Sequence, residues 1–354
     1  MLAMDGFAAR VRKVLVVRMS AIGDVILTLP VVDALHERLP EARIDFAIKR
    51  EFAELVEGHP GVARVWRFER ESGFGGLMRL AAEIAAERYD LVVDLHHNPR
   101  SIYLRWRSRA WMRRTYRKQT WQRMLLKTFG INLIKNAAPV ADRYFTALED
   151  FGLARGGRRP VLHLPARAAA EAGRALAAAG IEAGAGYVAV APGASYPTKR
   201  WPAAGFIEAA AELAGRGGQV GVVGGGSDRE VTAEVAAGLT AQGIKAADLA
   251  GGLTLAGSAA VLARARLLLT NDSGLMHAAD ALDVPLIAVF GPTRRELGFY
   301  PLGPRSGVVE HPGLRCRPCT LHGGPRCPKG HHRCMSEICA RDVVLVANEV
   351  LSRA

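Results

Sequence analysis

Short apolar, β-branched runs alternate along this 354-residue chain with longer stretches rich in Ala, Leu, Glu and Arg. This alternation is typical of a parallel β-sheet covered by helices, because each crossover between parallel strands needs a dozen or more residues. The predicted strands are Lys13–Val17, Arg43–Ile48, Val62–Phe68 and Asp90–Leu95, then Tyr187–Ala191, Gln219–Val223, Arg266–Thr270 and Pro285–Phe290. The helices predicted between them include Val25–Arg38, Leu77–Glu87, Ala203–Ala214 and Ser258–Ala265.

The length of the chain bears on the number of domains. A chain of 354 residues exceeds what one ordinary hydrophobic core supports and fits two domains. A region rich in Gly, Arg, Pro and Ala, residues 155–186, separates the two halves and favours a boundary near residue 160. We predict one domain over residues 1–160 and a second over 161–335, with one large sheet as the alternative.

Composition and charge limit the kinds of protein that this chain can be. With 49% hydrophobic and 23% charged residues, the chain has the composition of a folded soluble protein. Arg18, Asp24 and Pro30 interrupt the most apolar early run, so neither a membrane span nor a secretory signal is predicted. The net charge of +13 and the pI near 10.0 favour an anionic partner, such as nucleic acid, acidic lipid or a phosphorylated glycan.

The first predicted strand is followed by the segment Arg18-Met19-Ser20-Ala21-Ile22-Gly23-Asp24. Ligands of parallel α/β sheets collect beyond the carboxyl ends of the strands. A single glycine here is not a dinucleotide-binding fingerprint. Asp24 is therefore either an acid favoured by the dipole at a helix N-terminus or a general base that takes a proton from an attacking hydroxyl.

Four loops of the second half carry small, polar or charged residues after predicted strands. The loop after Tyr187–Ala191 offers hydroxyls and a lysine before Pro202 opens a helix, which suits a diphosphate. It lacks the Gly-Lys-Ser/Thr ending of a Walker loop. Three glycines precede an aspartate in the next loop, and a Ser-Gly pair starts the helix after the third. The candidate ligands are Ser195, Thr198, Lys199, Asp228, Asp272, Ser273, Gly274 and His277, and Gly291-Pro292-Thr293 forms the fourth loop.

These segments together resemble glycosyltransferase family 9, the ADP-heptose:lipopolysaccharide heptosyltransferases. The similar stretches are VLVVRMSAIGDVILTLPVVDAL, DLVVDLHHNPRS, APGASYPTKRWP, VGGGSD and LLLTNDSGLMHAADALDVPLIAVFGPT, in the family's order over residues 14–293. The resemblance implies a GT-B fold, in which two Rossmann-like domains with parallel sheets face a central cleft. It also implies that the last helix, within residues 336–354, packs back on the N-terminal domain.

The resemblance implies a role for each of these residues. Asp24 resembles the family's catalytic base, and Lys199 its diphosphate-binding lysine. Asp228 corresponds to an acid near the adenosine ribose, and Asp272, Ser273, Gly274 and His277 to the donor-binding segment. The implied reaction is a direct displacement with inversion at the anomeric carbon. The chain contains no Asp-x-Asp motif, which favours a metal-independent mechanism without a cofactor.

The segment from Arg100 to Lys127 is strongly basic. It contains ten Arg or Lys residues and no acid, interleaved with tyrosines and tryptophans. Such a pattern is typical of nucleic-acid, membrane or anionic-ligand binding, because ordinary solvated surfaces mix both signs. Because it lies in the predicted acceptor domain, we favour a phosphorylated lipid A–core acceptor at the inner face of the cytoplasmic membrane. The candidate acceptor ligands are Arg100, Arg113, Arg114, Arg117 and Lys118.

All five cysteines lie between Cys316 and Cys339, together with several histidines. The spacing of Cys316 and Cys319 suits structural zinc with Cys327 and Cys334, but the second pair lacks this spacing and the fifth cysteine leaves the ligand set ambiguous. We favour a reduced, metal-free loop in the cytosol, since the cysteines are not spread as a secreted disulfide framework.

These features lead to one preferred function and three alternatives. We predict a cytoplasmic, peripheral and monomeric heptosyltransferase that uses ADP-heptose and does not bind nucleic acid. A related transferase with another nucleotide-sugar is one alternative. The second is a relative that has lost catalysis, which would not need Asp24. The third is a basic nucleic-acid-binding protein with a zinc-stabilised tail, which leaves the four loops unexplained.

Overall fold

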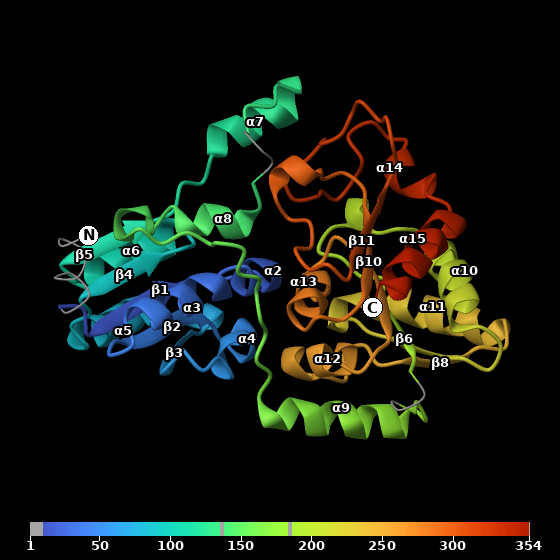
Figure 1. Cartoon of the computed structure of the whole chain (residues 1–354), viewed down its shortest axis with the longest axis horizontal. Helices are drawn as coiled ribbons and strands as arrows, with labels where there is room; N and C mark the ends of the chain where they lie inside the picture. The colour runs from blue at the N-terminus through green and yellow to red at the C-terminus, as the bar shows by residue number, and fades with distance from the viewer. Residues whose placement is uncertain (1–9, 135–137, 183–185, 354) are drawn as a thin grey trace. The chain divides into compact units, whose positions relative to one another are not determined.

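The computed structural model describes residues 10–134, 138–182 and 186–353, which form two compact units (Figure 1). The N-terminal unit comprises residues 1–118 and 139–165, and the C-terminal unit residues 119–138 and 166–354. The junction at residue 165 lies close to the predicted boundary near residue 160. Residues 119–138, which we assigned to the first domain, group instead with the C-terminal unit.

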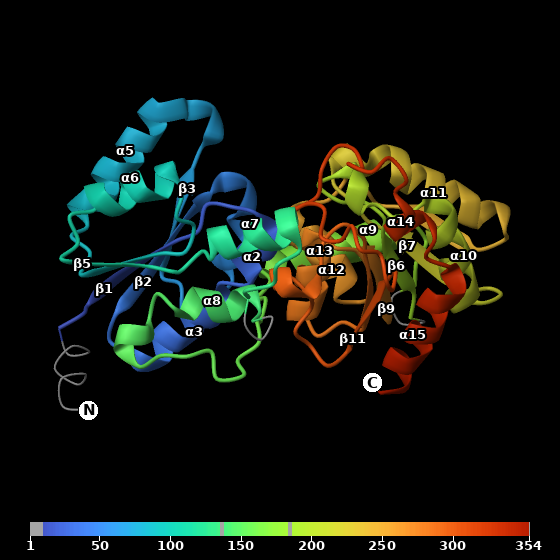
Figure 2. The same cartoon turned by 90° about the horizontal axis from the view of Figure 1, so that it is seen from above.

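The N-terminal unit is built on a five-stranded parallel sheet in the order β3-β2-β1-β4-β5. Helices α5 and α6 cover one face, and α3 and α8 cover the other (Figure 2). Every residue from Val14 to Val17 is buried, as expected for a central strand covered on both faces. The strands are β1 (Lys13–Val17), β2 (Arg43–Lys49), β3 (Arg64–Phe68), β4 (Leu91–Asp94) and β5 (Met112–Thr115). The helices are α2 (Ile22–Ile26), α3 (Leu29–Arg38), α4 (Glu54–Glu57), α5 (Gly73–Ala86), α6 (Pro99–Arg107) and α8 (Val140–Phe145).

The C-terminal unit contains a six-stranded parallel sheet in the order β11-β10-β9-β6-β7-β8. Helices α10, α11 and α15 pack on one face, whereas α9, α12 and α13 form the other layer (Figure 1). The strands are β6 (Val188–Ala191), β7 (Gln219–Val222), β8 (Lys245–Asp248), β9 (Leu267–Asn271), β10 (Leu286–Phe290) and β11 (Ser306–Glu310). The helices are α7 (Thr120–Phe129), α9 (Ala166–Ala178), α10 (Ala203–Ala214), α11 (Arg229–Ala241), α12 (Leu255–Leu262), α13 (Gly274–Ala281), α14 (Arg333–Ser336) and α15 (Ala340–Ser352).

Three strands that the sequence does not predict all lie at sheet edges. They are β5, β8 and β11. An edge strand is exposed along one side, so its sequence need not be a continuous apolar run. β5 reads MRRT and β8 reads KAAD, and neither carries the apolar signal by which the central strands are predicted.

The predicted helix Val25–Arg38 is interrupted. α2 ends at Ile26, and α3 begins at Leu29. Pro30 lies in the first turn of α3, where its missing N–H has no helical partner to lose. The break leaves α2 as a single short turn directly after the loop that follows β1.

The C-terminal helix α15 contacts α10, β10 and β11 of its own unit. Its buried residues Val343, Val344, Ala347 and Val350 belong to the main core of the C-terminal unit. The apolar face of this helix is therefore buried within its own unit. The expected packing of residues 336–354 on the N-terminal domain stays a prediction. Among the residues that the structure describes, no helix is both long and apolar enough to span a bilayer.

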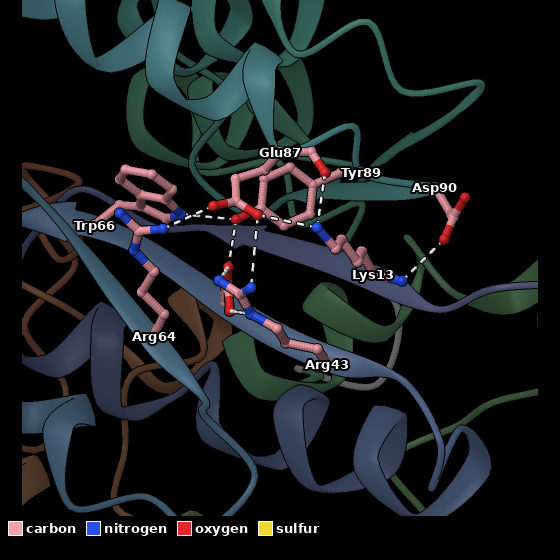
Figure 3. Close-up of polar contacts among 8 residues, drawn as sticks. Lys13, Arg43, Arg64, Trp66, Glu87, Tyr89 and Asp90 are labelled. Atoms are coloured by element: carbon pink, nitrogen blue, oxygen red, sulfur yellow. Dashed lines mark hydrogen bonds and ion pairs between the residues drawn. The ribbon is translucent and has the colours of Figure 1, made fainter.

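A buried polar network joins β2 and β3 to the segment just before β4 in the N-terminal unit (Figure 3). The Tyr89 hydroxyl accepts a hydrogen bond from Nε1 of Trp66 at 2.7 Å and donates one to the fully buried carboxylate of Asp45. Arg43 completes the network with an ion pair to Asp45 at 2.7 Å. Burial and the hydrogen bond to Asp45 raise the pKa of Tyr89 far above its usual value, so this hydroxyl keeps its proton.

Removal of this hydroxyl tests the network. Tyr89→Phe leaves the Trp66 N–H without its acceptor and removes one of the donors to the buried Asp45, which keeps only Arg43, so we expect a loss of about 1–3 kcal/mol in the free energy of unfolding. Urea titrations of both proteins measure it. Tyr103→Phe is the control, because the Tyr103 hydroxyl is half-buried and makes no hydrogen bond within the described part of the chain. Equal stability of wild type and Tyr89→Phe would contradict this role.

Candidate active site

The N-terminal unit brings Asp24 together with side chains from two other elements. Asp24 lies in α2, just past the carboxyl end of β1. Its Oδ1 accepts a hydrogen bond from the Tyr144 hydroxyl of α8 at 2.8 Å and lies 2.8 Å from Nη2 of Arg18. The Asp24 side chain is 26% exposed, whereas that of Arg18 is only 7% exposed. The carboxylate is thus held from two sides and still reaches solvent.

Arg18 and Tyr144 keep their protons around this carboxylate. Burial disfavours the Arg18 charge, but the Asp24 carboxylate together with Tyr144 and Tyr116 outweighs this and raises the pKa of Arg18 above its ordinary value. Arg18 also donates to the backbone carbonyls of Ser20 and Leu95, at 2.7 and 2.6 Å. Burial, aided by Asp24, raises the pKa of Tyr144 well above its usual range. Both groups therefore act as fixed donors that orient Asp24.

The loop after β4 adds a neutral histidine to the same sheet edge. The buried Asp94 carboxylate accepts from the backbone N–H of His96 and of His97, at 3.0 and 2.9 Å, and from the Ser101 hydroxyl at 3.1 Å. Burial, and next the charge of Arg18, lower the pKa of His96 to about 3. His96 is therefore uncharged at neutral pH, although it lies among cations.

In the C-terminal unit, Lys199 and Asp272 form a buried ion pair. Nζ of Lys199 lies 2.7 Å from Oδ2 of Asp272, with side-chain exposures of 13% and 6%. The Thr293 hydroxyl donates to the same Oδ2 at 2.8 Å. These residues follow β6, β9 and β10, which are neighbours in the sheet. Three of the four predicted loops therefore meet at one carboxylate, as the parallel topology requires.

The remaining loop, which follows β7, is held by Asp228. Its Oδ2 accepts from the backbone N–H of Gly225 at 3.0 Å, and its Oδ1 lies 3.4 Å from Arg200 of the lysine loop. A Cβ atom added to Gly193 would lie 2.3 Å from Cγ of Asp228, so only glycine fits there. Asp228 thus joins the loops after β6 and β7. Its predicted contact with a ribose stays a prediction.

Thr198 makes a structural contact that the sequence does not predict. Its hydroxyl donates to the carbonyl of Gly324 at 2.9 Å and accepts from the Gly324 N–H at 2.8 Å. Thr198 is 3% exposed. Its hydroxyl therefore fixes the cysteine-rich segment to the lysine loop, and its contact with a donor stays a prediction. Gly323 also packs on Lys199, where a Cβ atom would lie 2.9 Å from Cδ of the lysine.

The remaining predicted donor ligands differ in accessibility. Ser195 is exposed, and Ser273 and Gly274 are half-buried at the start of α13. The Ser273 hydroxyl caps this helix by accepting from the Met276 N–H at 3.3 Å. His277 is only 4% exposed and packs edge-on against Phe299. The α13 N-terminus is therefore open to a ligand, whereas His277 is enclosed.

The comparisons with known proteins agree with this geometry. The model of "Glycosyltransferase family 9 (heptosyltransferase)" matches residues 77–324, which is well over half of the chain. The chain belongs to glycosyltransferase family 9. It is 30% identical over 331 residues to lipopolysaccharide heptosyltransferase 1 of Pseudomonas aeruginosa, and the alignment covers 87% of this chain and 86% of that one.

Solved structures place the fold of this family member in the GT-B class. A family 9 glycosyltransferase of Veillonella parvula matches with a TM-score of 0.79 and 24% identity, covering 97% of this chain and 98% of that one. ADP-heptose lipopolysaccharide heptosyltransferase II of Escherichia coli matches with a TM-score of 0.75 and 24% identity, covering 96% and 99%. The predicted GT-B fold with two parallel sheets is confirmed.

The predicted acceptor arginines are not gathered at one point of this glycosyltransferase. Arg100 begins α6 and is exposed, and Lys118 Nζ donates to the His97 carbonyl at 2.8 Å, so both lie near the Asp24 edge of the sheet. Arg114 and Arg117 are instead paired with Asp150 and Glu149, at 3.1 and 2.9 Å. The guanidinium of Arg113 stacks 4.9 Å from the Trp106 ring. The sequence predicts one basic surface, and the structure divides it.

The five cysteines are all free thiols. Cys316 Sγ lies 3.8 Å from Nε2 of His331, and Cys334 is buried in the core of the C-terminal unit. Burial raises the pKa of the Cys334 thiol to about 11, so it stays protonated. Within residues 10–134, 138–182 and 186–353, no three His, Cys, Asp or Glu side chains are arranged to hold a metal ion. The preference for a reduced, metal-free loop over a zinc site stays a prediction.

Sequence reasoning missed Arg18, Asn271, Tyr144 and His96 as parts of the site. Asn271 accepts from the Trp201 N–H at 3.0 Å and donates to the Pro192 carbonyl at 2.7 Å, so it fixes both ends of the lysine loop. Asn271 lies directly beside Asp272, and Arg18 begins the segment that contains Asp24. The position of both residues at the carboxyl end of a strand was the available signal. Tyr144 lies 120 residues from Asp24, and nothing local indicates their contact.

The lowered pKa of His96 predicts a pH-dependent stability. The unfolded chain binds a proton at this histidine below about pH 6.5, whereas the folded chain does so only near pH 3. The stability from neutral His96 is complete above pH 6.5 and is lost as the pH falls toward 3. Between pH 6 and 4, wild type should lose up to about 1.4 kcal/mol per pH unit more than His96→Gln.

Urea titrations at pH 7, 6 and 5 measure this difference. The exposed His36 provides the control variant His36→Gln, which should follow the wild-type pH dependence. Parallel curves for wild type and His96→Gln would show that His96 is not held neutral by the fold.

Proposed function

We propose that this glycosyltransferase transfers heptose from ADP-heptose to the inner core of lipopolysaccharide. The observation that carries the proposal is the junction of Lys199, Asp272 and Thr293 at the carboxyl end of the C-terminal sheet. The relatives support the choice of sugar and acceptor, since they are lipopolysaccharide heptosyltransferases of Pseudomonas aeruginosa and Salmonella typhimurium. A heptosyltransferase of Escherichia coli that shares the fold was solved with ADP-2-deoxy-2-fluoro heptose.

The donor diphosphate binds, in this proposal, between Lys199 and the N-terminus of α13. Free N–H groups and the positive end of the helix dipole at Ser273 and Gly274 favour negative charge. Lys199 exchanges part of its ion pair with Asp272 for the phosphates. Asp272, which still accepts a hydrogen bond from Thr293, then limits where the Lys199 ammonium group can move. A cation fixed in this way stabilises the charge that develops on the departing ADP.

The reaction is a single displacement with inversion. The acceptor hydroxyl oxygen bonds to the anomeric carbon as the bond from that carbon to the ADP oxygen breaks. Asp24 takes the hydroxyl proton, and ADP leaves with the electron pair of the broken bond. Arg18 and Tyr144 orient the Asp24 carboxylate for this transfer. Lys199 and the helix N–H groups supply the positive charge, so we propose that neither a metal ion nor a cofactor is used.

The acceptor is an anionic lipid A–core molecule, which places the enzyme at the cytoplasmic face of the membrane as a peripheral monomer. Arg100 and Lys118, near the Asp24 edge, are the two predicted basic residues best placed to bind its phosphates. Arg114 and Arg117 already pair with acids, so an acceptor would have to compete with those acids for them. In this proposal, the excess positive charge of the protein attracts the anionic acceptor.

The role of Asp24 is tested by Asp24→Asn, which keeps the shape of the side chain but removes the base. We expect turnover with ADP-heptose and heptose-deficient lipopolysaccharide to fall a hundredfold or more, which is about the range for loss of a general base. ADP binding by calorimetry should stay near normal. Asp33→Asn is the control, since Asp33 is a partly exposed acid of the same unit. Wild-type turnover in folded Asp24→Asn would refute this role.

The role of Lys199 is tested by Lys199→Met, which retains much of the length of the side chain without its charge. Loss of a charge-assisted contact worth about 1.5–3 kcal/mol should weaken ADP binding roughly 10- to 150-fold. The exposed Lys245 gives the control Lys245→Met, for which we expect wild-type affinity. Calorimetry with ADP and UDP also tells whether the donor is an ADP-sugar or a UDP-sugar. Unchanged ADP affinity in Lys199→Met would remove the diphosphate contact from the proposal.

A further inference from the structure

A second basic region of the N-terminal unit lies away from Asp24. A cavity of about 600 Å³ is lined by four arginines and two tryptophans, which we call the Trp–Arg surface. It contains no acidic lining residue. Its aromatic and charged members are Arg105, Trp106, Arg109, Trp111, Arg113 and Arg114.

The strand register places part of the Trp–Arg surface at the sheet edge opposite the candidate active site. Arg109 and Trp111 precede β5, and the parallel pairing of β5 with β4 puts them at the amino end of the sheet. Asp24 follows β1 at the carboxyl end. Arg109 and Trp111 therefore lie at the sheet edge opposite Asp24, whereas Arg105 of the same surface lies 3.8 Å from the Asp94 carboxylate at the carboxyl edge. The part of the surface at the amino edge needs its own explanation.

The Trp–Arg surface exposes much apolar area to water. Trp106 is 63% and Trp111 57% exposed. On the neighbouring helix α5, Phe74 is 64% and Met78 50% exposed, and the Phe74 ring contacts Tyr103 of α6 at 5.6 Å. Figure 2 shows α5 and α6 side by side on the same face of the sheet. Exposed apolar groups gathered in this way mark an interaction site more often than scattered ones do.

The arrangement of these side chains fits a lipid surface. Arg113 stacks 4.9 Å from the Trp106 ring, and Trp111 Nε1 donates to Asp90 at 3.2 Å, so both indoles have a fixed neighbour. Indoles prefer the boundary between headgroups and acyl chains, whereas guanidinium groups bind phosphates. The acids that contact this surface, Asp90, Asp94 and Asp150, are fewer than its four arginines, so its net charge is positive.

We propose that the Trp–Arg surface docks this enzyme on a bilayer that contains anionic phospholipids. The arginines contact headgroup phosphates, and Trp106 and Trp111 enter the interfacial layer. The proposal rests on the proposed function insofar as that function puts the acceptor in a membrane. It adds which surface makes the contact and that lipid, not the acceptor glycan, is the ligand.

Co-sedimentation with vesicles tests the proposal. The probes are phosphatidylcholine vesicles with and without phosphatidylglycerol, titrated with the full-length protein. Arg107→Gln/Arg109→Gln removes the exposed charge of Arg109, within the Trp–Arg surface, and that of Arg107, the exposed last residue of α6 next to Trp106 in the chain. This double variant should weaken binding to the anionic vesicles about 30-fold, since each surface arginine contributes roughly a fivefold factor. Trp106→Ala/Trp111→Ala should abolish the binding that remains at high salt, because that part is apolar.

Two matched variants serve as controls. Arg216→Gln/Arg341→Gln removes the same number of exposed charges from the C-terminal unit, and Trp121→Ala removes an equally exposed tryptophan, which is 61% exposed on α7. Both should bind anionic vesicles within about twofold of wild type. Circular dichroism checks that each variant is folded.

Several results would overturn the proposal. Wild-type vesicle binding by the two surface variants would do so, as would equal losses in the controls. Displacement of the protein from vesicles by a single-stranded oligonucleotide that no longer binds the surface variants would assign the Trp–Arg surface to nucleic acid.

Transfer to acceptor in detergent micelles separates this proposal from the proposed function. Turnover in micelles should be unchanged in Arg107→Gln/Arg109→Gln. If turnover falls while vesicle binding persists, the surface binds the acceptor and not lipid. If wild type shows no transfer at all, the proposed function fails, and the vesicle titrations still decide whether the surface binds lipid.

Discussion

Both sheets of this protein are parallel throughout and covered by helices on two faces, and this constraint determines where polar chemistry can lie. Central strands such as β1, β4 and β9 are buried along their lengths, so they have almost no room for ionisable groups. Polar residues gather where the strands end. Because parallel strands all end at the same edge, residues far apart in the sequence become neighbours there.

Each candidate site depends on a partly buried ion pair, Arg18 with Asp24 and Lys199 with Asp272. Charges removed from water cost free energy unless partners satisfy them, and here tyrosine and threonine hydroxyls add the second contact. Such pairs contribute little net stability. Their value is positional, because a carboxylate or ammonium group fixed before the ligand arrives needs little reorganisation during the reaction.

The cysteine-rich segment belongs structurally to the lysine loop. The backbone N–H and carbonyl of Gly324 both form hydrogen bonds with the Thr198 hydroxyl. His332 Nε2 lies 2.9 Å from the Thr198 carbonyl oxygen, and Gly323 packs on Lys199. This explains why a segment without an obvious catalytic residue accompanies the donor loops. A change in the conformation of this segment would act on Lys199 directly, without any contact between the cysteines and the donor.

The sequence by itself determined the parallel α/β class, most central strands and the loops that carry Lys199, Asp272 and Asp24, because apolar periodicity and strand-end chemistry are local signals. It did not predict β5, β8 and β11, since edge strands do not need an apolar run. Only the tertiary structure paired Tyr144 with Asp24, engaged Thr198 with Gly324 and buried α15 in its own unit. These contacts join segments distant in the chain, and each depends on which surface remains uncovered after the sheets have formed. The same packing divided the basic segment. Helix α6 runs from the carboxyl edge of the sheet back to its amino edge, and β5 then returns to the carboxyl edge.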